Sequence, residues 1–406
     1  MNQNFRKRYY LIFFSTLLGP LTTNSLVPIF EELRLNFGLN SIALVSLAIS
    51  FYILPFAVFQ LFAGTFSDIV DKKLVVIIGF IIFIIGLVLT FIAVLIKIFY
   101  LFLLAFLIQG IGFSFINPTI LAILSTISPE NKKGVMMGIY NSSAGVGVSL
   151  GALLSGYLAN NFRGGWILLF IINPIIAVLA LILLLIALKN CEPLICRTFE
   201  TTSNHSANDK SSKLFATFQQ LKDNLKAPIL LLGAVGFICF FIVITLTNTL
   251  NEQLRISLSN LSEQEVIFYV SLILTINGLI SVLFSPMTGL MLRKINPYVM
   301  LSIGFILMSA MIFMPYGASI VDFMVISFVT YIGSAFVWPA LFKISMDINP
   351  EAEGTNSAII NSLRFIGYSL VGPFYLFFGI PVIYFWVIGL NFVAIIIIIV
   401  LDKLKV

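Results

Sequence analysis

The chain has 406 residues, of which 60% are hydrophobic, 14% aromatic and only 10% charged, and its mean hydropathy is +1.08. A soluble protein would carry about 25% charged residues, so these values exclude a soluble globular protein and indicate an integral membrane protein. The net charge of +6 does not predict a nucleic-acid partner. In a membrane protein, the side of the bilayer on which the charges lie decides their meaning.

Twelve apolar segments are each long enough to cross the bilayer as a helix, since a span needs about 20 residues at a rise of about 1.5 Å. Barrel strands need only about 10 residues, so the lengths favour helices. The segments fall at residues 9–30, 41–66, 74–96, 99–125, 135–159, 166–188, 228–250, 266–290, 298–316, 322–345, 358–379 and 382–401. We therefore predict an all-α polytopic membrane protein with twelve transmembrane helices.

The positive charges predict the orientation of these spans. With the N-terminus inside, the cytoplasmic segments hold 18 of the 23 Lys and Arg residues, the outer loops hold four, and Arg364 lies within a span. Cytoplasmic loops of membrane proteins carry such an excess of Lys and Arg. We expect a multi-pass protein of the cell membrane with both termini in the cytoplasm.

A long polar stretch separates two halves of six spans each. We predict an N-terminal bundle at residues 1–188, a flexible cytoplasmic linker at 189–227 and a C-terminal bundle at 228–406. The only histidine, His205, lies in the linker and is expected to be solvated. Cys191, Cys196 and Cys239 have neither metal-ligand spacing nor a disulfide pattern, so we expect free thiols and no metal or cofactor.

The two halves repeat each other in sequence. Thr23-Asn24-Ser25-Leu26 returns as Thr247-Asn248-Thr249-Leu250, at an offset of 224. Pro118 and Pro339 each lie six residues after an Ile-Gly pair, at an offset of 221, and the same offset relates Gly151 to Gly372. Ordered matches at a nearly constant offset indicate duplication of a six-helix unit, an architecture common in transporters with a site between the repeats.

The loop between the second and third spans carries a known signature. Its sequence Gly64-x-x-x-Asp68-x-x-x-Lys72-Lys73 resembles the motif of the major facilitator superfamily, and the likeness covers essentially the whole chain. The resemblance implies two six-helix bundles that open a central cavity alternately to either side. The second copy, at 289–294, has Arg293 where the acid is expected, which predicts an asymmetric gate.

Two further stretches are similar to the twelve-span drug/proton antiporter branch. Gln109-Gly110-Ile111-Gly112 is similar to a fourth-span motif of proton-coupled members, with Phe106 at the position of an expected arginine. Residues 151–156 are similar to the fifth-span glycine pattern of that branch. No Asp or Glu lies in the central third of any span. Either rim acids such as Asp68, Glu31 or Glu32 carry protons, or transport is not coupled to protons.

The predicted cytoplasmic gate consists of Gly64, Asp68, Lys72, Lys73 and Arg364. A charge inside a span is costly and suggests a function, and Arg364 is the only clear example. We hypothesise that it pairs with Asp68 across the halves when the protein is open outward. The alternatives are snorkelling to the cytoplasmic interface, or pairing with acids of its own half. Those acids are Asp347, Glu351 and Glu353.

The predicted substrate cavity combines amide, hydroxyl and indole groups from the spans that line the cavity in the family. Asn24 and Asn248 are repeat mates that can donate and accept hydrogen bonds, or can simply join helices to one another. Gln109 and Asn117 lie about 80° apart on one helix. The six predicted residues are Asn24, Gln109, Asn117, Asn248, Thr330 and Trp338.

These features predict a secondary transporter of a small organic solute, with efflux of hydrophobic or amphiphilic compounds as the first hypothesis. Uptake or facilitated diffusion of a neutral nutrient is the alternative. We expect a monomer in the lipid bilayer, with protons as a candidate coupling ion. A membrane enzyme would need clustered His, Cys or acidic residues at one face, and a channel would need a ring of like charges or a filter loop; the sequence shows none of these.

Overall fold

The computed structural model describes residues 11–69, 71–127, 133–189, 226–348 and 353–403. Within these ranges, side chains are not described at 64–69, 125–127, 133–138, 141, 346, 353–355, 357 and 358. The described residues form helices and no strands, which confirms the predicted all-α class. The predicted linker lies almost wholly outside the described residues.

The helices follow the predicted spans closely. The first half contains α2 (Leu18–Asn24), η1 (Val27–Ile29), α3 (Phe30–Phe37), α4 (Ile42–Ile69), α5 (Lys72–Ile96), α6 (Phe99–Ile127), α7 (Lys133–Asn161) and α8 (Leu168–Leu188). The second half contains α11 (Ala227–Ser257), α12 (Glu263–Met291), α13 (Pro297–Met308), η4 (Ser309–Tyr316), α14 (Ile320–Ile348) and α15 (Glu353–Lys403). Among the described residues, eleven stretches are long and apolar enough to span a membrane.

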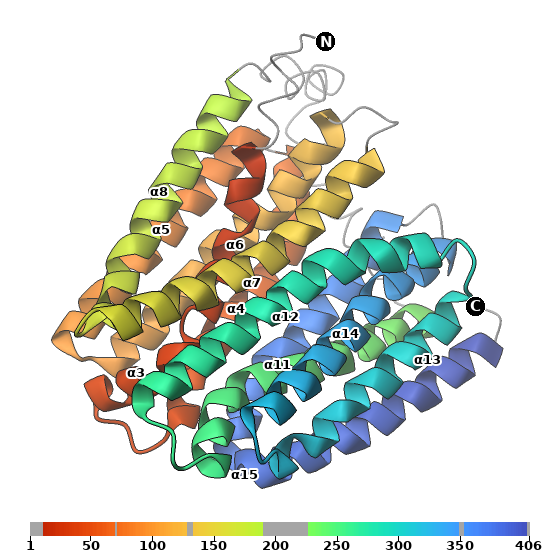
Figure 1. Ribbon diagram of the computed structural model, residues 1–406. Coiled ribbons are helices and arrows are strands. Elements are labelled where there is room, and N and C mark those ends of the chain that lie inside the picture. Colours follow the sequence, from red (N-terminus) through yellow and green to blue (C-terminus); the bar gives the residue numbers. More distant parts are fainter. Residues whose placement is uncertain (1–10, 70, 128–132, 190–225, 349–352, 404–406) are drawn as a thin grey trace.

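Helix α15 contains the two last predicted spans. At about 1.5 Å per residue its 51 residues would extend about 76 Å, more than twice the hydrocarbon thickness. The helix is interrupted at Gly379, whose φ of 68° and ψ of 176° are not helical. Only glycine adopts this conformation without strain. The chain therefore changes direction at Gly379, near the α15 label in Figure 1.

The first predicted span is also interrupted. A turn at Ser25 and Leu26 separates α2 from η1, and Pro28 has no backbone N–H to continue the helical bonding. Helix α3 then extends to Phe37, beyond the predicted end of the span, and α11 likewise continues to Ser257. These extensions project charged residues past the apolar part of each helix.

Each half packs mainly on itself, and the main contacts between the halves come from two pairs of helices, with further contacts of η1 on α11 and α12. Helix α4 packs on α15, and α7 packs on α12. Figure 1 shows the first half at the upper left and the second at the lower right, with α7 and α12 running side by side along the boundary. This arrangement agrees with the twelve-helix fold that the sequence predicted.

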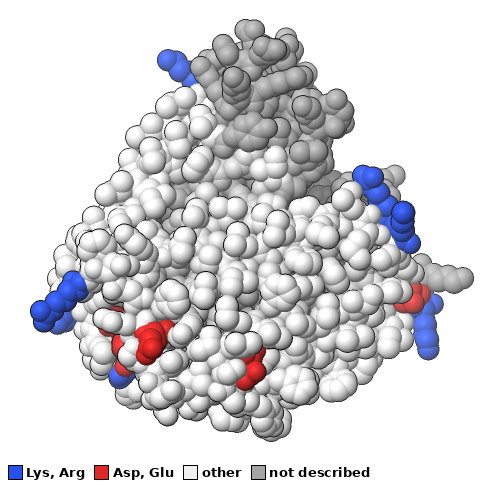
Figure 2. Space-filling view, in the orientation of Figure 1, with Lys and Arg blue, Asp and Glu red and all other residues white. Residues whose placement is uncertain are grey.

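The outer surface of the helices is apolar. On α5, Ile78, Ile81 and Ile85 are exposed and follow helical spacing, as large apolar residues do on α8. In Figure 2 the charged side chains gather at the ends of the molecule and leave an uncharged band between them. An exposed apolar belt of this extent is the surface that lipid chains cover.

Candidate functional site

The contact between α7 and α12 brings the two backbones close together. A Cβ atom added at Gly145 would lie 2.8 Å from the Gly278 carbonyl oxygen, nearer than real Cβ atoms approach. One turn further, the Ser149 hydroxyl donates to the Thr275 carbonyl at 2.8 Å. Small residues allow such close packing between membrane helices, so this boundary is a tight contact along both helices.

The register of α4 against α15 is set by three contacts. The Gln60 side-chain amide donates to the Ser362 hydroxyl at 3.4 Å, and the rings of Phe56 and Phe365 meet edge to face at 4.8 Å. Further along, a Cβ atom at Gly372 would contact Ser50. The two helices are thus antiparallel, and residues whose numbers add to about 422 lie at the same level.

One end of the boundary is joined by hydrogen bonds between the halves. The Asn251 amide on α11 donates to the carbonyls of Val27 and Pro28 at 3.1 Å each, at the point where the first span is interrupted. Its Oδ1 accepts from Arg255, which also pairs with Glu263. We call this end, which the charge distribution predicts to be extracellular, the outer end.

Two more acids are bound at the outer end. Glu31 pairs with Arg34 on the next turn of α3, with nitrogen to oxygen distances of 2.6 and 2.7 Å. Tyr375 of α15 donates a hydrogen bond to Glu252 of α11. These pairings help α3 and α11 to extend beyond the apolar part of the membrane, whereas Oε2 of Glu32 is buried without a hydrogen-bond partner.

Arg364 lies in a cage of aromatic rings on the side of α15 that faces α11 and α14. Its Cζ atom is 4.4 Å from the centre of the Trp338 ring, 4.5 Å from that of Phe365 and 4.9 Å from that of Phe240. The rings of Phe240 and Trp338 meet edge to face at 4.6 Å. We call Phe240, Trp338 and Phe365 the aromatic cage.

The aromatic cage borders the first half. Phe56 of α4 packs on Phe365, and Tyr140 of α7 lies close enough to Arg364 to interact with it electrostatically. The Tyr140 hydroxyl donates to Asn117 Oδ1 at 2.6 Å. Both halves therefore contribute side chains around one partly buried guanidinium.

Arg364 has no anionic partner among the described residues. The described acid that the sequence offered as a partner in its own half, Asp347, is exposed and makes no ion pair with it. The Arg364 Nε atom is buried and has no hydrogen-bond partner. The guanidinium is held by ring faces instead of by a carboxylate.

The predicted gate has a shorter turn than expected. Helix α4 continues through Gly64 and Asp68 to Ile69, so most of the predicted turn is helical. Helix α5 begins at Lys72, because Asp71 caps it by accepting a hydrogen bond from the Lys73 amide at 3.0 Å. Only the backbone of Gly64 and Asp68 is described.

In this conformation the register of α4 and α15 does not bring Asp68 to the level of Arg364. Arg364 is level with residue 58 of α4, by the contacts of Gln60 and Phe56. Asp68 is ten residues further along, or about 15 Å at the helical rise. The pairing of these two residues in another conformation remains a prediction.

The predicted cavity residues do not share one set of neighbours. Asn117 and Trp338 are partly buried. Asn117 bonds to Tyr140, and Trp338 contacts Arg364. Thr330 is fully buried and donates to the Ile326 carbonyl of its own helix. Asn24 donates to the Pro20 carbonyl at 2.9 Å, whereas the Oδ1 atom of buried Asn248 has no partner. A cavity shared by all six remains a prediction.

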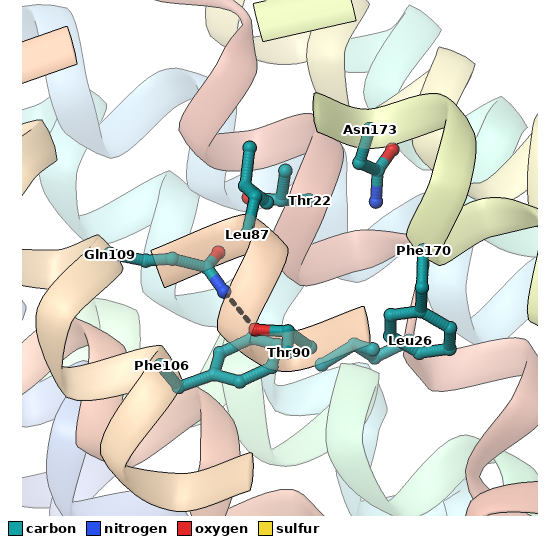
Figure 3. A pocket seen from close by; sticks show the side chains of 8 residues that line it. All are labelled: Thr22, Leu26, Leu87, Thr90, Phe106, Gln109, Phe170 and Asn173. Carbon is teal, nitrogen blue, oxygen red and sulfur yellow. Dashed lines mark hydrogen bonds between the residues drawn. The ribbon is translucent and has the colours of Figure 1, made fainter. Parts of the chain in front are cut away.

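Gln109 faces the interior of the first half. Figure 3 shows its amide donating to the Thr90 hydroxyl, at 2.6 Å, beside a small pocket. The pocket is lined by residues of the first half alone: Thr22, Leu26, Leu87, Thr90, Phe106, Gln109, Phe170 and Asn173. Gln109 and Asn117, although on one helix, thus contact different neighbours.

Sequence reasoning did not identify Phe240, Phe365, Tyr140 or Asn251. With 40 phenylalanines in the chain, residue type alone does not separate a cage residue from a lipid-facing one. Asn251 did carry a signal, because it lies in a span-end segment and is offset by 224 from Val27. The sequence repeat therefore relates the two residues that the structure brings together.

The fold and the boundary between the halves define a polytopic helical membrane protein of the transporter type. The family model of the Major Facilitator Superfamily matches residues 12–372, and the chain belongs to this family. Its membership confirms the resemblance to the superfamily. The family and the apolar helices support a multi-pass membrane protein.

Two proteins are similar to parts of the chain. A riboflavin transporter of Clostridioides difficile is 28% identical over 172 residues, which cover 42% of this chain and 36% of the relative. An uncharacterized MFS-type transporter of Mycobacterium tuberculosis is 23% identical over 302 residues, covering 64% and 51%. The matches span about a third and a half of the relatives' lengths.

Proposed function

We propose that this protein exports small hydrophobic or amphiphilic organic compounds by alternating access. The observation that supports this function is the convergence of Phe56 and Tyr140 from one half with the aromatic cage of the other. A site lined by both halves is what a transporter needs when its halves move about a central substrate. The apolar, aromatic lining favours compounds with a large apolar part.

We further propose that the protein acts at the cell membrane, as a monomer with both termini in the cytoplasm. Protons are the proposed coupling ion, which would make it an antiporter of the drug-efflux branch. The rim acids Glu31, Glu32 and Asp68 are the groups proposed to carry them.

The test is a panel of amphiphilic compounds in energised inverted vesicles, with and without a protonophore. We expect uptake of at least one amphiphile into the vesicles, and its loss when the proton gradient collapses. Uptake that is unchanged by the protonophore would overturn antiport. Vesicles without the protein provide the background for passive entry.

Uptake of a neutral nutrient is the second candidate function. Its support is the partial similarity to the riboflavin transporter, together with an aromatic site that suits a planar ring. Whole cells that depend on external riboflavin separate the two functions. Growth rescue by this protein without export of any amphiphile would favour uptake.

A further inference from the structure

We propose that Arg364 and its aromatic cage form an anion-binding substrate site, selective for planar aromatic compounds that bear a carboxylate or sulfonate. The inference rests on the proposed transport function and names the substrate class. The inference requires a negative charge on the substrate, whereas the aromatic side chains alone would suit any amphiphile. The reasons are the charge of Arg364, its missing partner and the geometry around it.

The first reason is electrostatic. An arginine side chain stays protonated and offers five N–H donors. A charge removed from water without a partner costs several kcal/mol. Arg364 nevertheless has no ion pair with a described acid, and its Nε has no hydrogen-bond partner. An anion at this position would supply the missing acceptors.

The second reason is that the cage only partly replaces such an anion. A cation over an aromatic ring is attracted by the ring face, and three ring centres lie within 4.9 Å of the Arg364 Cζ atom. Ring faces attract the charge but accept hydrogen bonds poorly. The guanidinium is thus held in place while its N–H groups stay available, which suits the two-oxygen edge of a carboxylate or sulfonate.

The third reason is the aromatic surface next to the guanidinium. Phe365 packs edge to face on Phe56 across the boundary, and Phe240 packs edge to face on Trp338 and Phe365. Aromatic rings favour such offset or perpendicular contacts with a further ring. A substrate with its acid on Arg364 would place its own ring against these side chains.

The site also contains polar groups from the first half. The Tyr140 hydroxyl donates a hydrogen bond to Asn117 and interacts electrostatically with Arg364. Arg364 itself is partly buried, and its Nε atom is buried without a hydrogen-bond partner. A bound anion would therefore touch both halves, which couples its binding to their relative position.

The alternative is that Arg364 only fastens α11, α14 and α15 together through its ring contacts. Such a role needs the charge but no ligand. The two roles differ in whether the acid group of a small molecule changes its affinity. The experiment therefore compares ligands that differ only in that group.

Binding is measured by isothermal titration calorimetry on the purified full-length protein in lipid nanodiscs. The probes are 1-naphthoate, its neutral amide 1-naphthamide, and cyclohexanecarboxylate, which keeps the acid and lacks the aromatic ring. We expect 1-naphthoate to bind at least tenfold more tightly than either of the others. Equal affinities, or no binding of any probe, would overturn the proposal.

Variants then assign the preference to the cage. Arg364→Gln should remove the preference for the acid over the amide, whereas Arg163→Gln, at an exposed position, should leave it unchanged. An acid preference retained in Arg364→Gln overturns the proposal. If Arg364→Gln does not fold, Phe240→Leu decides, because it should lower the ratio of 1-naphthoate to cyclohexanecarboxylate affinity by several fold while the charge remains. An unchanged ratio overturns the proposal in that case.

The outcome is independent of the transport assay. Transport of amphiphiles without preference for acids in the binding assay would overturn this inference and leave the proposed function. Acid-selective binding without transport in either direction would overturn the proposed function and leave the site.

Discussion

Arg364 illustrates how far a single residue can be understood from sequence. Its position inside a span marked it as functional, because a charge there is costly. The sequence did not show what would surround it, since the cage residues come from α11, α14 and α15, and only three-dimensional packing brings Phe240 and Trp338 to one guanidinium. In the predicted gate Arg364 binds the carboxylate of Asp68, whereas in the inferred site it binds the acid group of the substrate.

Charge reversal tests the predicted pairing of Asp68 with Arg364. Asp68→Arg and Arg364→Asp should each abolish transport, and the double variant should regain part of it if the pair forms in the opposite conformation. Transport is measured in vesicles with the best substrate from the panel. Combining Asp347→Arg with Arg364→Asp is the control for pairing within the second half. If neither double variant regains transport, an ion pair of Arg364 is not part of the gate.

At the scale of the elements, hydrophobic length predicted most of the described spans closely, whereas α3 and α11 extend beyond the predicted ends of their spans. The break at Gly379 falls between two predicted spans, and the short ninth span proved to be α13 followed by the 3-10 helix η4. The extension of α11 to Ser257 was not predicted. Its cause is tertiary, because Asn251 and Glu263 hold Arg255 at the outer end.

Gly379→Ala should destabilise the change of direction within α15. A non-glycine residue in this conformation costs about 1–3 kcal/mol, so the melting temperature in detergent should fall. Gly389→Ala is the matched control, since a Cβ atom there meets nothing within 4 Å. Alanine favours a helix over glycine, and this control should leave the melting temperature unchanged or raise it. Equal melting temperatures for the two variants would contradict the role of Gly379.

Gly278→Ala should disturb the contact of α7 with α12. The new Cβ atom would lie 2.5 Å from the Gly145 carbonyl oxygen, so the helices must separate. We expect a loss of transport of more than tenfold in vesicles at matched protein levels. Gly289→Ala, on the same helix but in open space, should transport normally. Normal transport by Gly278→Ala would show that this close approach is dispensable.

At the scale of the whole molecule, the sequence repeat and the charge distribution predicted the architecture, because both depend only on the order of residues in the sequence. The candidate site could be predicted only in part. Trp338 contacts Arg364 and Asn117 bonds to Tyr140, whereas Gln109 bonds to Thr90 inside the first half. A helical period gives the direction of a side chain and not the neighbour that it meets.

Asn251→Ala should weaken the closure at the outer end. The substitution removes two hydrogen bonds to the first half, each worth about 0.5–1.5 kcal/mol, so the equilibrium should shift about tenfold toward opening. The readout is the rate at which a membrane-impermeant maleimide labels Ser25→Cys in a protein without its native cysteines. Ser25 is buried at the closure. We expect faster labelling in Asn251→Ala.

The control for this closure is Asn161→Ala. Asn161 also donates an amide hydrogen bond, but to Tyr157 of its own helix. Its loss should leave the labelling rate unchanged. Equal rates for both variants would show that the bonds of Asn251 do not hold the outer end.

The bond between Asn251 and Val27 also bears on how the two halves diverged. The two residues occupy equivalent places in the repeat, 224 positions apart, and yet one offers a side-chain amide and the other a backbone carbonyl beside a proline. Two copies of either half would present like groups to each other at this point. The two halves have thus become complementary and are no longer interchangeable. When expressed as separate polypeptides, they should assemble with each other in preference to pairing with themselves.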